Sequence, residues 1–139
     1  MRRLLLLACG LVLYMIAPAQ ETVTFWEPEK AYKEALELFD HEDYVNAREA
    51  FREVITQTRT TTDPDIKAIR VNSEFYLALS ALTLQNPDGE HLMLSFLNNH
   101  TGNANSNRAF FHLGDYYYRK KKYRDVVKYH ERVDPFELS

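Results

Sequence analysis

The stretch AFFHLGDYYYRKKKYRDVVKYHERVDP, residues 109–135, decides the fold of this chain. Three tyrosines at 116–118 precede four basic residues at 119–122, and apolar residues recur at helical spacing on both sides. Aromatic rings beside cations could hold single-stranded nucleic acid. The same letters also predict two amphipathic helices joined by a charged turn. The net charge of −3 favours the helices, because a nucleic-acid-binding domain is usually strongly basic.

The first nineteen residues form a separate segment. Two arginines precede an apolar run from Leu4 to Ala17, and the sequence Ala-Pro-Ala follows at 17–19. This layout is typical of a secretory signal peptide, with cleavage expected after Ala19. The run is shorter than the roughly 20 residues that a membrane-spanning helix needs, which disfavours an uncleaved anchor. A polar lead over residues 20–27 follows.

Cysteine usage limits the chemistry of the exported chain. Cys9 is the only cysteine, and it lies inside the predicted signal peptide. The residues after it stay apolar, which disfavours a lipoprotein acylation box. After cleavage the chain has no thiol, so disulfides and cysteine-bound metal are excluded. Export without disulfides is typical of a bacterial envelope protein.

Helix signals predict six helices in three antiparallel pairs. Pro28 can open the first helix, and Asp63 with Pro64 can cap and open the third. Asn86 and Pro87 can do the same for the fourth. Polar breaks separate the periodic stretches at residues 40–43, 58–65, 85–89, 99–107 and 120–122. Period-two alternation is not convincing anywhere, so an all-α fold is expected.

The three pairs repeat. A small residue in the first helix precedes a small or branched residue in the second by 12 positions in every pair: Ala35 and Ala47, Ser80 and Leu92, Gly114 and Val126. The second and third pairs are offset by 34 residues (114 − 80), and the first and second by 45 (80 − 35). A helix–turn–helix period of 34 is the signature of the tetratricopeptide repeat.

Residues 28–134 resemble tetratricopeptide repeats, most specifically in the third repeat. The family pattern of an aromatic, Leu-Gly, two tyrosines around a turn and a late proline is matched by Phe110, Leu113, Gly114, Tyr117, Tyr123 and Pro135. Departures from the pattern stand at Glu34, Leu92, Val126 and His130. The resemblance implies an α-solenoid array over residues 28–139, with repeats at about 28–61, 73–103 and 107–135.

The resemblance also implies how single residues pack. Gly114 is expected against Val126 where the last two helices cross, and Tyr117 and Tyr123 in packed positions. Arg119–Lys122 would face solvent with no groove beside them. Residues 1–139 contain no obvious polar capping helix. A marginal or self-associating molecule is therefore predicted, with unpartnered side chains at the C-terminal end: Val127, Tyr129 and Val133.

More narrowly, the chain is similar to the start of exported tetratricopeptide-repeat proteins of Bacteroidetes. In those proteins a segment like VDPFELS, residues 133–139, leads into a further repeat. We therefore expect a product truncated at Ser139, whose full form continues the array. The expected location is the periplasm or the outer membrane of a Gram-negative cell, with membrane contact only through the signal peptide before cleavage.

The resemblance implies a protein–protein interaction scaffold without catalysis. A protein or peptide ligand would bind on the concave side, which the first helix of each pair lines. Polar candidates for contacting it are Lys33, Glu37, Asn72, Arg108, His112 and Asp115. The alternative interpretation is that these residues are simply solvated helix faces. Alternative functions are an outer-membrane carbohydrate- or nutrient-capture module and an enzyme whose catalytic domain lies downstream.

Motifs for catalysis or cofactors are not found. His41 and Glu42 begin like the metalloprotease motif H-E-x-x-H, but Val45 stands where the second histidine is required. A nucleophile elbow and a glycine-rich phosphate loop are also missing, so we expect no metal and no cofactor. The negative net charge also leads us to expect no bound nucleic acid.

Charge is uneven: residues 27–65 hold eleven acidic and five basic residues, and residues 108–134 hold eight basic and four acidic. This asymmetry could orient a partner or a second copy.

Overall fold

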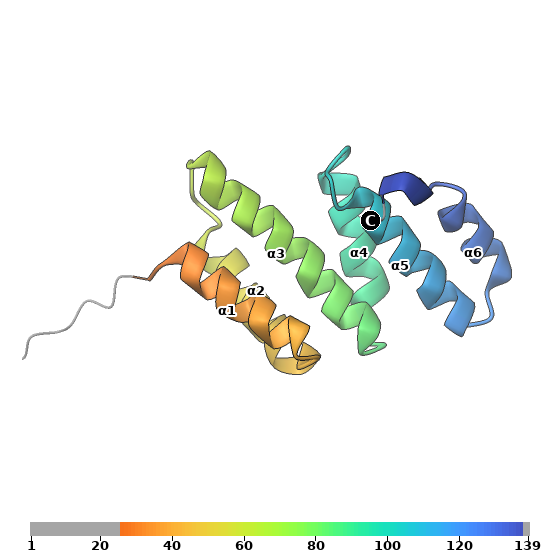
Figure 1. Ribbon diagram of the computed structural model, residues 1–139, viewed down its shortest axis with the longest axis horizontal. Helices are drawn as coiled ribbons and strands as arrows, with labels where there is room; N and C mark the ends of the chain where they lie inside the picture. Colours follow the sequence, from red (N-terminus) through yellow and green to blue (C-terminus); the bar gives the residue numbers. More distant parts are fainter. Residues whose placement is uncertain (1–25, 138–139) are drawn as a thin grey trace, which may run out of the picture.

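The computed structural model describes residues 26–137, and the predicted signal peptide lies outside them. Within this range the regular structure is helical and contains no strand, so the all-α class is confirmed (Figure 1). The elements are α1 (Pro28–Asp40), α2 (Tyr44–Gln57), α3 (Pro64–Thr83), α4 (Gly89–Asn99), α5 (Ser106–Arg119), α6 (Tyr123–His130) and a short 3₁₀ helix, η1 (Pro135–Glu137). No helix of residues 26–137 combines the length and the apolar character needed to cross a membrane.

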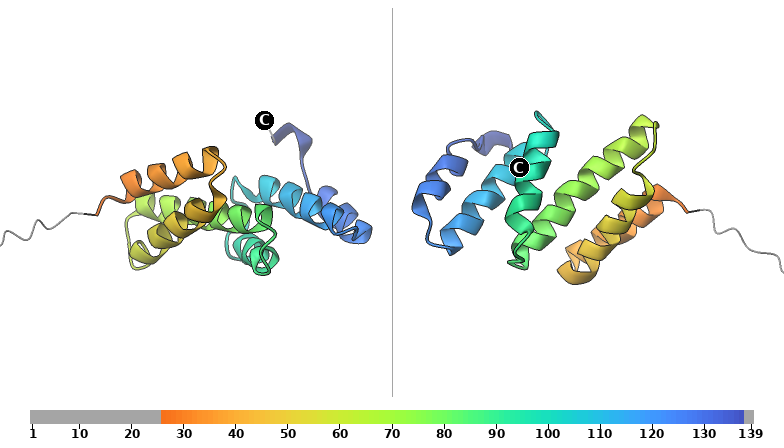
Figure 2. Two further views of the ribbon diagram at one scale, coloured as in Figure 1. Left: turned by 90° about the horizontal axis from the view of Figure 1, so that it is seen from below. Right: turned by 180° about the vertical axis from the view of Figure 1, so that it is seen from behind.

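The helices form three hairpins that follow one another in a row (Figures 1 and 2). The hairpins are α1–α2, α3–α4 and α5–α6. The first helices contact each other in turn, α1 with α3 and α3 with α5, and each second helix contacts the first helix of the next hairpin. The side of the molecule built from the three first helices is called the α1–α3–α5 face below.

Local sequence signals explain where three of the helices begin. Pro28 occupies the first turn of α1 and Pro64 that of α3, as predicted. The Asp63 carboxylate accepts hydrogen bonds from the backbone N–H groups of residues 65 and 66, at 2.8 and 3.2 Å. Asp43 caps α2 in the same way through the N–H of Asn46. Each cap satisfies a helix donor that would otherwise lack a partner.

One type of turn ends the first helix of every hairpin. Glu42, Gln85 and Lys121 lie there in the left-handed region, with φ of 60°, 56° and 59°. In each turn the backbone N–H of this residue donates to the carbonyl three positions before it. The N–H of the next residue donates to the carbonyl five positions before itself. These bonds satisfy carbonyls at the helix end and reverse the chain.

The start of α4 differs from the prediction. The helix begins at Gly89, with Asp88 as its N-cap, rather than at Asn86 and Pro87. The Asp88 carboxylate makes no capping bond; it pairs instead with the Arg48 guanidinium of α2 at 2.6 Å. Gly89 lies directly on the end of α3, where an added Cβ would come within 2.8 Å of the Leu82 nitrogen. One contact between hairpins, Arg48 with Asp88, and one within the second hairpin, Gly89 against α3, therefore fix this helix start.

Aromatic side chains fill the space between the hairpins. Phe51, Phe75 and Phe96 are the largest fully buried side chains. The ring of Phe51 in α2 stacks on Tyr76 in α3, with centroids 5.3 Å apart, and Phe39 in α1 meets the same ring edge-on at 5.1 Å. Burial of a phenylalanine contributes about 1.5–3 kcal/mol. Stacking between hairpins thus supplies much of the core.

The last hairpin corrects three packing predictions. The side chain nearest to Gly114 is His130 rather than Val126, since an added Cβ at 114 would lie 2.0 Å from His130 Cδ2. Tyr129 is not unpartnered: it is 5% exposed and stacks on Tyr117 at 5.4 Å. Tyr123 is not packed but 60% exposed. Val127 does lack a partner, as predicted, with 54% exposure.

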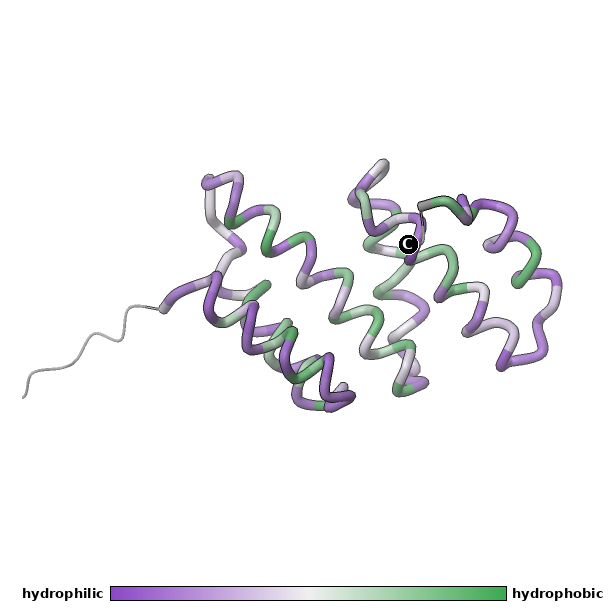
Figure 3. The backbone as a smooth tube through the Cα atoms, viewed as in Figure 1, coloured by the Kyte–Doolittle hydropathy of each residue, from purple (hydrophilic) through white to green (hydrophobic). Residues whose placement is uncertain are grey.

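The distribution of hydropathy follows this packing. Figure 3 shows hydrophobic residues along much of α3, which has neighbours on both sides, and a hydrophilic turn between α5 and α6. Residues 119–122 are all exposed, as predicted. A small hollow of about 180 Å³ nevertheless lies beside Arg119 and Lys120, so the expectation that no groove adjoins this turn is wrong.

Candidate functional site

Arg108 of α5 lies above two aromatic rings of the neighbouring helix α3. Its guanidinium carbon is 5.1 Å from the centre of the Phe75 ring and 5.8 Å from that of Tyr76. Cations in this position are attracted by the negative face of the ring. Among residues 26–137 no carboxylate forms an ion pair with Arg108. The charge therefore has a packed position but no counter-ion among the residues that the structure describes.

A chain of hydrogen bonds holds this arginine in place. Arg108 donates to the Asn105 side-chain oxygen at 3.3 Å, and Asn105 donates through its amide to Asn72 of α3 at 3.0 Å. The two asparagines thereby link α5 to α3 beside the guanidinium. Arginine has five N–H donors, and only one has a protein acceptor in the part of the chain that the structure describes. The arrangement leaves donors for a ligand.

Arg108 affects the pKa values of two titratable rings beside it. The pKa of His112 is lowered from 6.5, first by burial and then by the Arg108 guanidinium, with Asp115 opposing this and Arg119 adding to it. The pKa of Tyr32 in α1 is raised to about 12, mainly by burial and by Tyr76, while Arg108 lowers it. Both rings are therefore neutral at pH 7, and Arg108 carries the positive charge of this cluster.

Three of the six predicted site residues come together here. Asn72 is linked to Arg108 through Asn105, and His112 lies one turn beyond Arg108 on the same helix. Lys33 and Glu37 are exposed on α1 and pair with no charged group among residues 26–137. The Asp115 carboxylate lies 3.8 Å from His130 of α6.

Sequence reasoning missed four contributors to this site. Asn105 lies three residues before Arg108 at the start of α5, which is the spacing of neighbours on one side of a helix. That spacing was a usable signal. Tyr32, Phe75 and Tyr76 have the periodicity of core residues, and nothing local distinguishes a ring under a cation from a ring in the core. Only the contacts of α3 with α5 and with α1 bring them to the arginine.

The arrangement can bind an anion but shows no catalytic set. A guanidinium with free donors recognises carboxylates in a planar, two-bond geometry. The half-buried rings of Tyr32 and Tyr76 offer apolar contact beside it. Within residues 26–137 no group of three or more His, Cys, Asp or Glu side chains is placed to hold a metal ion.

The basic turn between α5 and α6 is a separate surface. Tyr117 is buried, and its hydroxyl donates to the Glu90 carboxylate of α4 at 2.6 Å. Tyr118 and Tyr123 are exposed and meet edge-on at 6.2 Å. Only two of the tyrosines around the basic residues are thus accessible.

In comparisons with known proteins, no family model, no curated protein and no solved structure matches this chain.

Proposed function

We propose that this chain is a tetratricopeptide-repeat solenoid that acts as a protein–protein interaction scaffold in the envelope of a Gram-negative bacterium. Three features support the solenoid. The helices pair into hairpins, the hairpins contact one another in the same order, and one type of turn ends each first helix. Repeats of this kind bury a continuous core by stacking and leave long surfaces for partners.

The observation that carries the binding role is Arg108, a cation above two rings without a counter-ion among the described residues. A charge half-buried in a packed site gains most from a partner of opposite sign. We propose that the α1–α3–α5 face binds an extended or helical peptide whose aspartate or glutamate side chain pairs with Arg108. Apolar residues next to that acid would contact Tyr32 and Tyr76, which are half-buried. The proposed role makes and breaks no covalent bond.

A selection from a random peptide library on phage tests this role. The purified protein is expected to enrich peptides that carry an acidic residue beside apolar ones. Synthetic copies should bind Arg108→Gln at least about tenfold more weakly, since a hydrogen bond to a charged group is worth about 1.5–3 kcal/mol. Arg124→Gln is the matched control, because Arg124 is exposed on α6 and away from this face. The absence of enrichment, or equal binding by Arg108→Gln, would contradict the proposal.

Export rests on residues 1–19, outside the described residues. Expression of the full chain in a Gram-negative host, followed by fractionation and N-terminal sequencing, is expected to give an envelope protein that begins at Gln20. A protein that keeps its first nineteen residues in the cytoplasmic fraction would refute export. It would leave the peptide-binding proposal standing, because that proposal depends only on the α1–α3–α5 face.

A further inference from the structure

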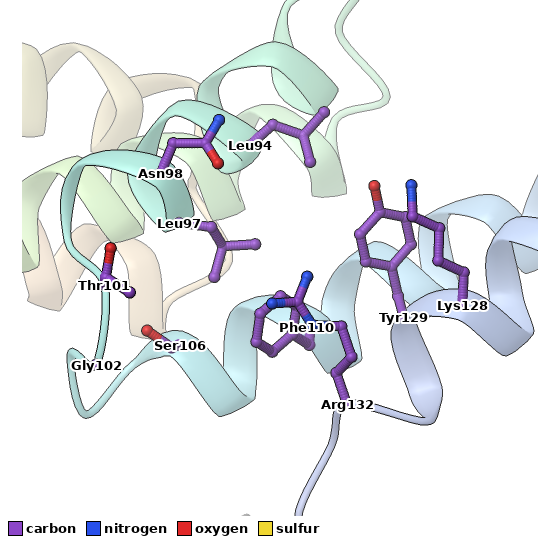
Figure 4. Close-up of a pocket in the computed structure, with 10 residues that line it drawn as sticks. All are labelled: Leu94, Leu97, Asn98, Thr101, Gly102, Ser106, Phe110, Lys128, Tyr129 and Arg132. Atoms are coloured by element: carbon purple, nitrogen blue, oxygen red, sulfur yellow. The ribbon is translucent and has the colours of Figure 1, made fainter.

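A second hollow lies between α4 and α6, with α5 as its floor (Figure 4). Its volume is about 560 Å³. Sites for small molecules typically measure about 300–1,000 Å³. None of the six predicted binding residues lines it. We call it the α4–α6 groove.

Apolar side chains form one part of the groove. Leu94 and Leu97 of α4 line it opposite Phe110 of α5, and both leucines are half-buried. The positions 45 residues earlier, on α2, hold Glu49 and Arg52, an exposed pair 2.5 Å apart. The first hairpin therefore has a solvated ion pair where the second presents leucines to a hollow.

Two cations on α6 form the other part. Arg132 lies just beyond α6, with its guanidinium carbon 4.0 Å from the centre of the Phe110 ring, and the Lys128 ammonium is 5.0 Å from that of Tyr129. Figure 4 shows both side chains on the α6 side of the groove. Neither cation forms an ion pair within residues 26–137, and no carboxylate lines the groove. Its charge is positive and uncompensated.

The corresponding hollow one hairpin earlier has a different chemistry. It lies between α2 and α4, measures about 310 Å³ and is lined by Ile55, Leu77 and the Glu74 carboxylate, without lysine or arginine. A hollow between successive second helices is thus a general product of the stacking. Of these two hollows, only the α4–α6 groove has two cations and no acid in its lining.

We propose that the α4–α6 groove binds a small organic anion with an apolar body, namely an aliphatic or aromatic carboxylate. The apolar body lies against Leu94, Leu97 and Phe110, where it loses contact with water. The carboxylate pairs with Arg132 and Lys128, which the rings beneath them already position. Charge complementarity selects this class of ligand, because the groove offers donors and positive charge to one end of the molecule and hydrocarbon to the other.

Fluorescence titration of the purified protein with 1-anilinonaphthalene-8-sulfonate tests the proposal. This probe has an aromatic body and one negative charge, and N-phenyl-1-naphthylamine is its uncharged relative. Lys128→Gln with Arg132→Gln should weaken binding of the charged probe at least about tenfold and that of the neutral probe less than about twofold. Dodecanoate should displace the charged probe. Unchanged binding of the charged probe by the double variant, or no displacement by dodecanoate, would overturn the assignment.

Two further variants locate the site. Lys121→Gln with Arg124→Gln removes the same charge from the exposed turn and helix start nearby, and it should leave both affinities unchanged. Leu97→Trp fills the groove and should abolish binding of both probes, with the helix content verified by circular dichroism. Retained binding in this variant would place the probes on another surface and refute the proposal. Displacement by a glutamate-rich peptide at lower concentration than by dodecanoate would also refute a small-molecule ligand.

Discussion

The imidazole of His130 lies in the space that a side chain at position 114 would need. An added Cβ at Gly114 would lie 2.0 Å from His130 Cδ2 and 2.1 Å from Nε2. The same imidazole stacks on Phe111, with centroids 5.8 Å apart and planes at 11°. The absence of a side chain at 114 therefore lets α6 approach α5 through His130.

We expect Gly114→Ala to destabilise the protein only while His130 is present. Overpacking typically costs about 1–3 kcal/mol, whereas alanine favours a helix over glycine by about 1 kcal/mol. Gly114→Ala should thus lower the free energy of unfolding by about 1 kcal/mol. In a His130→Ala background the same substitution should raise the free energy of unfolding by about 1 kcal/mol. Urea unfolding of the four proteins measures both effects, and an equal change in both backgrounds would show that His130 is not the obstacle.

Gly89 should tolerate substitution much less well. A Cβ there would meet backbone atoms of α3, namely the Leu82 nitrogen at 2.8 Å and the Ala81 carbonyl carbon at 2.9 Å. Backbone in a helix cannot rotate away as an imidazole can, so Gly89→Ala should cost about 2–3 kcal/mol and separate α4 from α3. Gly102→Ala is the control: its φ is 78° but nothing lies within 4 Å, so only about 1 kcal/mol of backbone strain is expected. Similar losses for both variants would argue against the close approach.

Local chemistry made part of this fold predictable. Pro28 and the pair Asp63 and Pro64 act within one turn of chain, and the helices begin where they predict. The start of α4 was not predictable, because Asp88 is held by Arg48, forty residues earlier in the chain. No pattern around Asp88 reveals that partner.

The repeat alignment also has a physical limit. It gives Tyr118 and Tyr123 the positions of Phe39 and Tyr44 in the first hairpin. There the Phe39 ring is covered by Tyr76 of the next hairpin, whereas no ring from a following hairpin lies against Tyr118 within residues 26–137. An equivalent position in sequence therefore has a different exposure. Arg108 could be proposed from the sequence as a polar residue of a first helix. The rings beneath it could not, because only the packing of neighbouring hairpins brings them there.

The lowered pKa of His112 predicts a pH-dependent contribution to stability. Because burial and Arg108 depress the pKa in the folded state below 6.5, the unfolded chain binds more protons at His112 as the pH falls. The contribution of His112 to the free energy of unfolding is complete above about pH 6.5. It is lost as the pH falls through the pKa that His112 has in the folded state. His112→Gln should reduce the slope of unfolding free energy against pH between about 7 and 5. Residue-resolved NMR titration should give a midpoint below 6.5, and a midpoint at or above 6.5 would contradict the prediction.

The exposed apolar side chains at the last hairpin predict self-association. Tyr118, Tyr123 and Val127 are 63%, 60% and 54% exposed, and they lie on the α5–α6 hairpin. Contact with a second copy would remove these apolar side chains from water. Burial of apolar surface contributes about 25 cal/mol per Å² before the costs of association. Sedimentation velocity should show a concentration-dependent increase in mass at neutral pH.

Replacing the three side chains by serine should abolish this association. Val45→Ser is the matched control, because Val45 is equally exposed at 60% but lies on α2, at the other end of the row of hairpins. The basic residues at 119–122 repel one another across a contact between two copies of this end, so added salt should strengthen the association. A protein that stays monomeric at all concentrations and salt levels would refute the prediction, and weakening by salt would instead indicate a contact between this basic end and the acidic first hairpin.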